Sequence, residues 1–101
     1  MMDELIEHLR IHHALDKSPR EAMLLVADHP TAREIVVTPD ALKQALCKAL
    51  PERGEALFER LGLRIPYSLS ALCYLALYDD WLCYAMCLTL EALLTNCENV
   101  V

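Results

Sequence analysis

Glycine is scarce in this chain of 101 residues, and so is positive charge beyond residue 64. With only two glycines, the sequence lacks the phosphate-binding loop and the nucleophile elbow, and it contains no metalloprotease helix motif. All nine Lys and Arg fall within residues 1–64 and the net charge is −6, whereas binding to nucleic-acid phosphates requires clustered positive charge. We therefore expect neither an enzyme nor a nucleic-acid-binding protein.

A long uninterrupted apolar run is also missing. Residues 67–78 and 81–90 are mainly apolar, but Asp79 and Asp80 stand between them. A membrane-spanning helix needs about 20 consecutive apolar residues, and charged side chains at mid-bilayer would cost several kcal/mol. The sequence therefore predicts no membrane span.

Cysteine is present without the spacing of a disulfide framework or a zinc site; the five residues are Cys47, Cys73, Cys83, Cys87 and Cys97. Their odd number, together with the charged and amphipathic residues 1–10, favours a reducing cytosol. Cys83 and Cys87 are one helical turn apart, and with Cys73 they could form a zinc site or a redox pair. Buried thiols more commonly pack as small apolar residues, so we expect no metal and no cofactor.

Apolar residues, in contrast, are abundant and make up 55% of the sequence. A chain of this size fits one domain, which buries only roughly 65% of the surface that it exposes when unfolded. No linker or low-complexity segment divides residues 1–101, so we expect a single domain. Either its core is unusually complete, or some apolar surface is left to meet a partner.

Helix-start signals recur along the first two thirds of the sequence. Ser18-Pro19 and Thr38-Pro39 each place a capping side chain before a proline at the first helical position. Pro51 marks another start, and residues 31–34 (TARE) match a capping box. Gly62 fits the residue that follows the end of a helix.

These signals and the apolar pattern predict helices over residues 3–15, 18–28, 31–37, 39–49, 51–61, 67–78 and 81–96. The one strand-like run, Ile35-Val36-Val37, is too short to predict a sheet. The predicted class is all-α: a compact bundle of about six or seven short antiparallel helices that ends in an apolar helical hairpin.

Asp79 and Asp80 predict the turn of this hairpin. Aspartate is unfavourable inside a helix and favourable before one, because its carboxylate accepts hydrogen bonds from free N–H groups and meets the positive end of the helix dipole. We expect Asp80 to cap the helix that starts at Trp81, with Asp79 one place farther out.

The hairpin carries Leu72, Ala85 and Ala92 at the spacing of a leucine and two close-packed alanines, with Asp80 near the turn. In this register residues 67–100 resemble a single degenerate unit of the tetratricopeptide repeat family, whose stacked helix pairs form grooves for peptides. No upstream segment repeats at about 34 residues, and the chain departs from the family pattern at Leu69, Cys73, Ala76, Thr89 and Cys97. The resemblance implies a helical hairpin and the binding of a peptide, and it assigns no binding residues.

Aromatic residues are concentrated in the same hairpin: Tyr67, Tyr74, Tyr78, Trp81 and Tyr84. Tyr and Trp are enriched at the centres of protein interfaces, so these five are the candidate partner-binding residues, with ordinary core packing as the alternative. We expect a small cytosolic interaction module, an adaptor or a secretion-type chaperone, that captures an amphipathic helix. Its partner would be another protein or a second copy, held largely through residues 65–96 in a hetero-complex or a homodimer.

Two alternative functions remain open. The acidic balance fits a small inhibitor or regulator that blocks a larger protein through its acidic face. His8, His12 and Asp16 follow one another at one helical turn, and their side chains could share a metal ion in a metal-binding protein or an enzyme. The other interpretation is that the two histidines border the core and form local hydrogen bonds.

Overall fold

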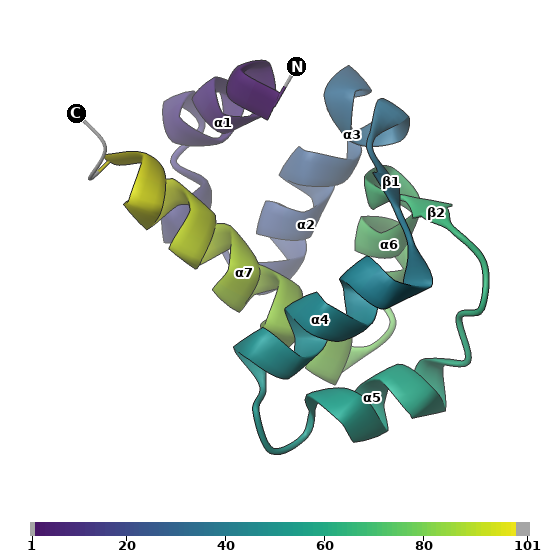
Figure 1. Ribbon diagram of the computed structural model, residues 1–101. Helices are drawn as coiled ribbons and strands as arrows, with labels where there is room; N and C mark the ends of the chain where they lie inside the picture. The colour runs from purple at the N-terminus through teal and green to yellow at the C-terminus, as the bar shows by residue number, and fades with distance from the viewer. Residues whose placement is uncertain (1, 99–101) are drawn as a thin grey trace.

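Helices with short connections make up nearly all of the structure, a computed structural model that describes residues 2–98 (Figure 1). The helices are α1 (Met2–Ile11), α2 (Pro19–Ala27), α3 (Pro30–Glu34), α4 (Pro39–Ala49), α5 (Gly54–Leu61), α6 (Leu69–Ala76) and α7 (Asp80–Glu98). A 3₁₀ turn, Ala14–Asp16, follows α1, and two short strands are β1 (Val36–Val37) and β2 (Tyr67–Ser68). The predicted all-α bundle is confirmed.

The starts of α2 and α4 are those that the sequence predicts. Ser18 Oγ accepts a hydrogen bond from the backbone N–H of Glu21 at 3.3 Å, and Thr38 Oγ1 accepts one from Ala41 at 3.1 Å. In both helices a proline occupies the first turn, where its missing N–H costs no hydrogen bond. Gly62 ends α5 with a φ of 67°, a left-handed conformation that glycine adopts without steric cost.

The start of α3 differs from the prediction, because His29 caps it and Thr31 does not. The Nδ1 atom of His29 accepts a hydrogen bond from the backbone N–H of Thr31 at 3.1 Å. Pro30 takes the first helical position, which leaves the residue before it as the cap. Thr31 is instead buried within the first turn.

The connection from α4 to α5 is also tighter than predicted. A turn over residues 51–53 replaces the expected helical start at Pro51, and α5 begins at Gly54. The backbone N–H of Gly54 donates to the Leu50 carbonyl at 2.7 Å. A Cβ atom at Gly54 would overlap the backbone carbonyl of Leu46, so only glycine permits this close approach of the two helices.

β1 and β2 form a small antiparallel ladder, contrary to the expectation that the strand-like run is too short to pair. Residues 36–37 pair with residues 67–68, and Val36 lies opposite Ser68. The predicted helical start at residue 67 is therefore wrong, because that residue is extended. Ser68 caps α6, since its Oγ accepts a hydrogen bond from the backbone N–H of Ala71 at 3.0 Å.

The predicted cap of α7 is wrong by one residue: Asp79 caps the helix, and Asp80 is its first residue. The Oδ1 atom of Asp79 accepts a hydrogen bond from the backbone N–H of Leu82 at 3.0 Å. Arg60 of α5 donates two hydrogen bonds to the same carboxylate, at 2.7 and 3.1 Å. The Asp80 side chain is 95% exposed and lies 3.6 Å from Arg20. The contact from Arg60 therefore distinguishes the two adjacent aspartates.

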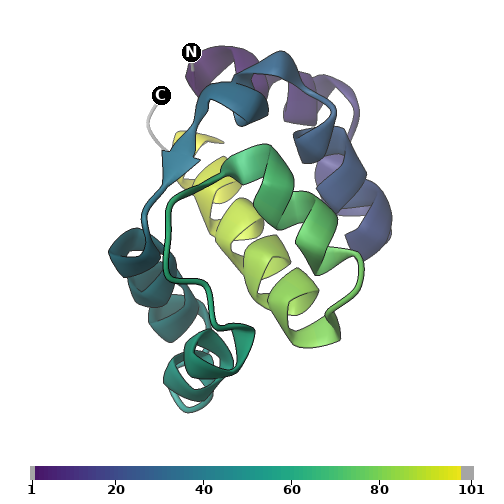
Figure 2. The same ribbon diagram turned by 90° about the vertical axis from the view of Figure 1, so that its right-hand side faces the viewer.

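The core lies where α2, α6 and α7 pack against one another, and Figure 2 shows α4 and α5 as a pair beside this group. Its central side chains include Met23, Leu72 and Leu82, which are almost completely buried. The buried hydroxyl of Ser70 donates a hydrogen bond to the Ala27 carbonyl at 2.8 Å and so joins α6 to α2. Within residues 2–98, none of the helices combines the length and the apolar character needed to cross a bilayer.

Candidate functional site

The predicted aromatic residues do not form one cluster. Trp81 and Tyr84 lie together on the first turn of α7, with ring centroids 6.2 Å apart in an edge-to-face arrangement. Their exposed fractions are 44% and 51%, so neither is a fully buried core residue. The guanidinium carbon of Arg53 lies 4.8 Å from the Trp81 ring centroid, which is a cation–π contact.

The three other aromatic residues point to different neighbours. The hydroxyl of Tyr74 donates a hydrogen bond to Asp28 Oδ1 at 2.8 Å, at the C-terminal end of α2. Tyr67 lies in β2 opposite Val37 and is half-buried. Tyr78, in the turn before α7, is 87% exposed. Whether any of the five binds a partner stays a prediction.

A larger feature, which sequence reasoning missed, is an apolar cavity of about 250 Å³ inside the bundle, here called the central cavity. The hairpin of α6 and α7 supplies the following residues to its lining: Leu69, Leu72, Cys73, Met86, Thr89, Leu90 and Leu93. Residues of α1, α2, α4 and the β1 region complete the lining, among them Met2, Leu5, Met23, Val26 and Leu46. The apolar C-terminal hairpin therefore contributes to a cavity as well as to the core.

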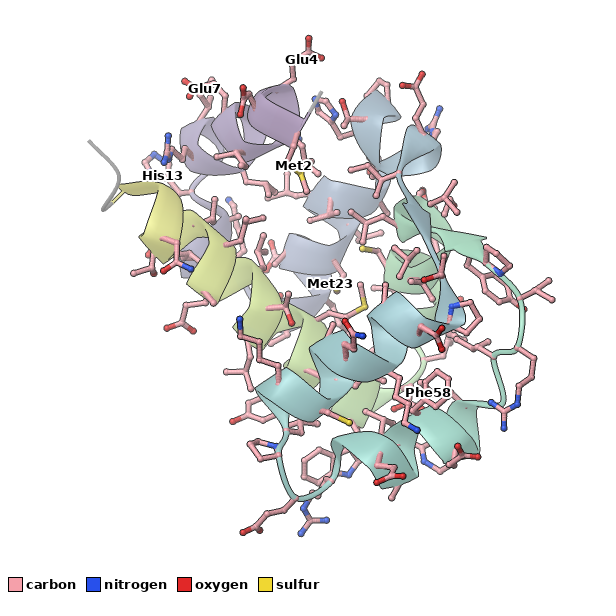
Figure 3. The ribbon with its side chains drawn as sticks, in the orientation of Figure 1. Met2, Glu4, Glu7, His13, Met23 and Phe58 are labelled. Carbon is pink, nitrogen blue, oxygen red and sulfur yellow. The ribbon has the colours of Figure 1, made fainter. Side chains whose placement is uncertain are left out.

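The central cavity opens to solvent beside α1. Met2 is 41% exposed although it lines the cavity, and Thr89 on α7 is also exposed. Figure 3 shows Met2 pointing from the start of α1 into the space in front of α2, where Met23 also lies, while Glu4 and Glu7 point away from it. The entrance is thus lined by a flexible methionine, a residue type that adapts to differently shaped apolar groups.

The cavity offers little hydrogen-bonding capacity to a polar ligand among the residues that line it. The hydroxyl proton of Thr89 is already used, because Oγ1 donates to the Ala85 carbonyl at 3.0 Å. Burial raises the pKa of the Cys73 thiol to about 12, so this thiol stays protonated at neutral pH. An occupant of the cavity would therefore be held by burial of apolar surface.

Three histidines from two segments meet beside α1. The His8 ring centroid lies 4.6 Å from that of His12 and 4.7 Å from that of His29. Burial, followed by the proximity of His12 and His29, lowers the pKa of His8. These neighbours disfavour protonation of His8, and His29 already uses Nδ1 to cap α3.

The structure does not place His8, His12 and Asp16 on one helix, as a metal site shared by these side chains would require. The predicted helix 3–15 ends at Ile11, because His13 adopts a left-handed φ of 52°, and Asp16 lies in the 3₁₀ turn that follows. Among the described residues, no group of three or more His, Cys, Asp or Glu side chains is arranged to hold a metal ion.

The cysteines that the structure describes are free thiols: Cys47, Cys73, Cys83 and Cys87. Cys73 and Cys83 are buried in the core, as expected of small apolar residues. Burial also raises the pKa of Cys87 to about 11, and its thiol lies 3.8 Å from the Pro19 carbonyl. The side chain of Cys97 lies outside the described residues.

Among the described residues, the central cavity and the Trp81–Arg53 contact are two candidate sites for another molecule. Comparisons with family models, with curated proteins and with solved structures found no match to this chain.

Proposed function

We propose that the protein is an interaction module that binds an amphipathic helix of another protein at the central cavity. The observation that carries the proposal is a cavity of about 250 Å³ that is lined by apolar residues except for Thr89 and reaches the surface at Met2. Amphipathic helices bind in this way, by placing apolar side chains of one face into a hydrophobic groove. As an adaptor or a chaperone, the protein would act in the cytosol, in keeping with its free thiols.

The size of the cavity favours side chains over a whole small molecule. Pockets for drug-sized ligands usually have volumes of about 300–1,000 Å³ and contain a few polar groups that fix the orientation of the ligand. The central cavity is smaller, and the one hydroxyl among its described lining residues, that of Thr89, already donates to the Ala85 carbonyl. The polar face of a docked helix would stay in water, so only its apolar side chains would need to enter.

Charge favours a helix with a basic polar face. α1 carries Asp3, Glu4 and Glu7, and α7 carries Glu91 within its second half, while Arg10 is the one Lys or Arg of these two helices. Lysine or arginine on the side of the docked helix that faces α1 and α7 would meet these carboxylates and speed association.

A cavity-filling substitution tests the proposal. Ala45 of α4 lines the cavity, and Ala41, one turn earlier on the same helix, is exposed and does not. Ala45→Leu fills part of the cavity, whereas Ala41→Leu adds the same atoms outside it. The probe is a synthetic helical peptide with Leu on one face and Lys on the other, and the control peptide replaces each Leu by Ala.

We expect the Leu peptide to bind the wild type and Ala41→Leu, and to bind Ala45→Leu much more weakly, as measured by calorimetry. Thermal melts of both variants confirm that the fold is retained. Equal binding to Ala45→Leu and the wild type would refute the proposal. If a second copy of the protein occupies the cavity, sedimentation should show a dimer for the wild type and a monomer for Ala45→Leu. This result would refute a separate helical partner and indicate self-association.

A further inference from the structure

A second site lies at the opposite end of the molecule from α1, between α5 and the start of α7 (Figure 1). It is a pocket of about 190 Å³, here called the Arg53 pocket, and its lining residues are Leu50, Arg53, Ala56, Leu57, Arg60 and Trp81. It shares no lining residue with the central cavity. Its floor is apolar, since Leu50 and Leu57 are buried, and its rim carries two arginines.

Both charged residues that line this pocket are arginines, although the net charge of the protein is −6. Arg60 donates two hydrogen bonds to the carboxylate of Asp79, which also accepts one from the backbone N–H of Leu82. Arg53 contributes a second positive charge that is not paired with Asp79.

Arg53 is the group with unused bonding capacity. Within the described part of the chain its guanidinium forms no ion pair, and its guanidinium carbon lies 4.8 Å from the Trp81 ring centroid. An arginine beside an aromatic ring can still bind a carboxylate through its N–H groups with two parallel hydrogen bonds. Trp, Tyr and Arg are also the residue types that dominate binding energy at interfaces, and Tyr84 lies beside Trp81.

We infer that the Arg53 pocket binds a peptide segment of a partner protein in which an aliphatic side chain lies next to an Asp or Glu. The aliphatic side chain enters the pocket against Leu57 and the face of Trp81. The carboxylate pairs with Arg53 at the rim. This segment is acidic, whereas the helix proposed for the central cavity is basic, so the two sites differ in charge and do not depend on each other.

The test uses the fluorescence of Trp81, the only tryptophan in the chain. The probe is a short synthetic peptide that contains a Leu-Glu pair and is blocked at both ends, so that Glu carries its only charge. Two comparison peptides replace Glu by Gln and Leu by Ala. We expect the Leu-Glu peptide to change the Trp81 emission on binding, and each comparison peptide to bind about tenfold more weakly or worse.

Variants of Arg53 test whether its positive charge is needed to bind the peptide. Arg53→Gln should weaken binding about tenfold or more, whereas Arg10→Gln makes the same change of charge on α1, far from the pocket, and should leave it unchanged. Arg53→Glu should bind a Leu-Lys peptide in place of the Leu-Glu peptide, and this reversal cannot arise from a variant that fails to fold. Raising the salt concentration from about 0.05 to about 0.5 M should weaken the wild-type complex.

Four results would overturn the inference. Equal binding of the Gln and Glu peptides would mean that charge contributes nothing to binding at the Arg53 pocket. Inorganic phosphate that competes as strongly as the peptide would indicate a plain anion site. A dimer that dissociates in Arg53→Gln would make a second copy the occupant, and no change in Trp81 emission at about 1 mM peptide would mean that the pocket binds no such segment.

Discussion

Asp79 offers the sharpest test of how the C-terminal hairpin is held together. Its carboxylate is only 13% exposed, caps α7 through Leu82, and accepts two hydrogen bonds from Arg60. Loss of an N-cap costs about 0.5–2 kcal/mol, and we expect Asp79→Ala to lie in the upper half of this range because the pairing with Arg60 is lost as well. In a domain of this size about 1 kcal/mol corresponds to a fall of roughly 4–8 °C in Tm.

Two matched variants separate the contributions to this effect. Asp79→Asn keeps an oxygen that can cap the helix and loses the charge, so it should destabilise less than Asp79→Ala. Asp80→Ala removes a solvent-exposed carboxylate from the adjacent position and should leave stability unchanged. Urea melts of the three variants at about pH 7 measure these differences. A loss in Asp80→Ala as large as that in Asp79→Ala would refute the assignment of the cap.

The pH dependence gives an independent check on the same residue. The hydrogen bonds from Arg60, and then that from Leu82, lower the pKa of Asp79 in the folded protein. A carboxyl whose pKa is lowered by folding stabilises the protein above its unfolded pKa of about 3.9, and this contribution disappears as the pH falls through the folded pKa. The difference in stability between wild type and Asp79→Asn should therefore be present at neutral pH and shrink in acid. A difference that stays constant into strong acid would contradict the ion pair.

Further predictions concern the close contacts of the core. Gly54→Ala should destabilise the protein by about 1–3 kcal/mol in urea melts, because its Cβ overlaps the Leu46 carbonyl; unchanged stability would contradict the close approach of α4 and α5. Ser70→Ala should cost about 1–3 kcal/mol in the same assay, since the buried Ala27 carbonyl loses its donor; a cost near zero would mean that this bond contributes nothing. Cys73, with its pKa raised to about 12, should resist alkylation at neutral pH until the protein is unfolded, as followed by mass spectrometry; rapid alkylation in the native state would contradict its burial.

Features that depend on a few neighbouring residues were predictable from the sequence. Ser18 and Thr38 cap their helices as expected, because a capping oxygen followed by proline defines a helix start without help from the rest of the fold. The end of α5 at Gly62 follows in the same way from the left-handed conformation. Together these local signals were sufficient to predict the all-α class.

Features that depend on distant contacts were not predictable. The choice between Asp79 and Asp80 is made by Arg60, which lies 19 residues earlier. The pairing of β1 with β2 joins segments on either side of α4 and α5, and no property of either segment alone indicates it. Residue type alone groups the aromatic residues, yet Tyr74 donates a hydrogen bond to Asp28 at the end of α2 while Trp81 contacts Arg53.

The central cavity belongs to this second group. Its lining comes from α1, α2, α4, α6 and α7 and from the region of β1, so it exists only once the helices are packed. The high content of apolar residues indicated surplus apolar surface but gave no location for it. Met2, Met23 and Met86 all line the cavity, and their type was the one local signal that could have suggested an adaptable apolar site.

The ladder of β1 and β2 has a consequence for the motion of the molecule. β1 ends at residue 37 and β2 begins at residue 67, so the ladder holds together the two ends of the segment 38–66, which contains α4 and α5 (Figure 2). Apart from the ladder, this segment is joined to the rest of the bundle through the packing of α4 on α7, the contact of Arg60 with Asp79 and the contact of Arg53 with Trp81. Such a unit can detach as a whole at a lower free energy than global unfolding.

Amide hydrogen exchange should then show residues 38–66 exchanging as one cooperative group, ahead of α2, α6 and α7. Because Leu42, Ala45 and Leu46 of α4 line the central cavity, each such opening also removes one side of it. The lifetime of this ladder, which has only two residues in each strand, would then govern access to the central cavity. A bound helix that touches α4 would slow the hydrogen exchange of the whole segment 38–66.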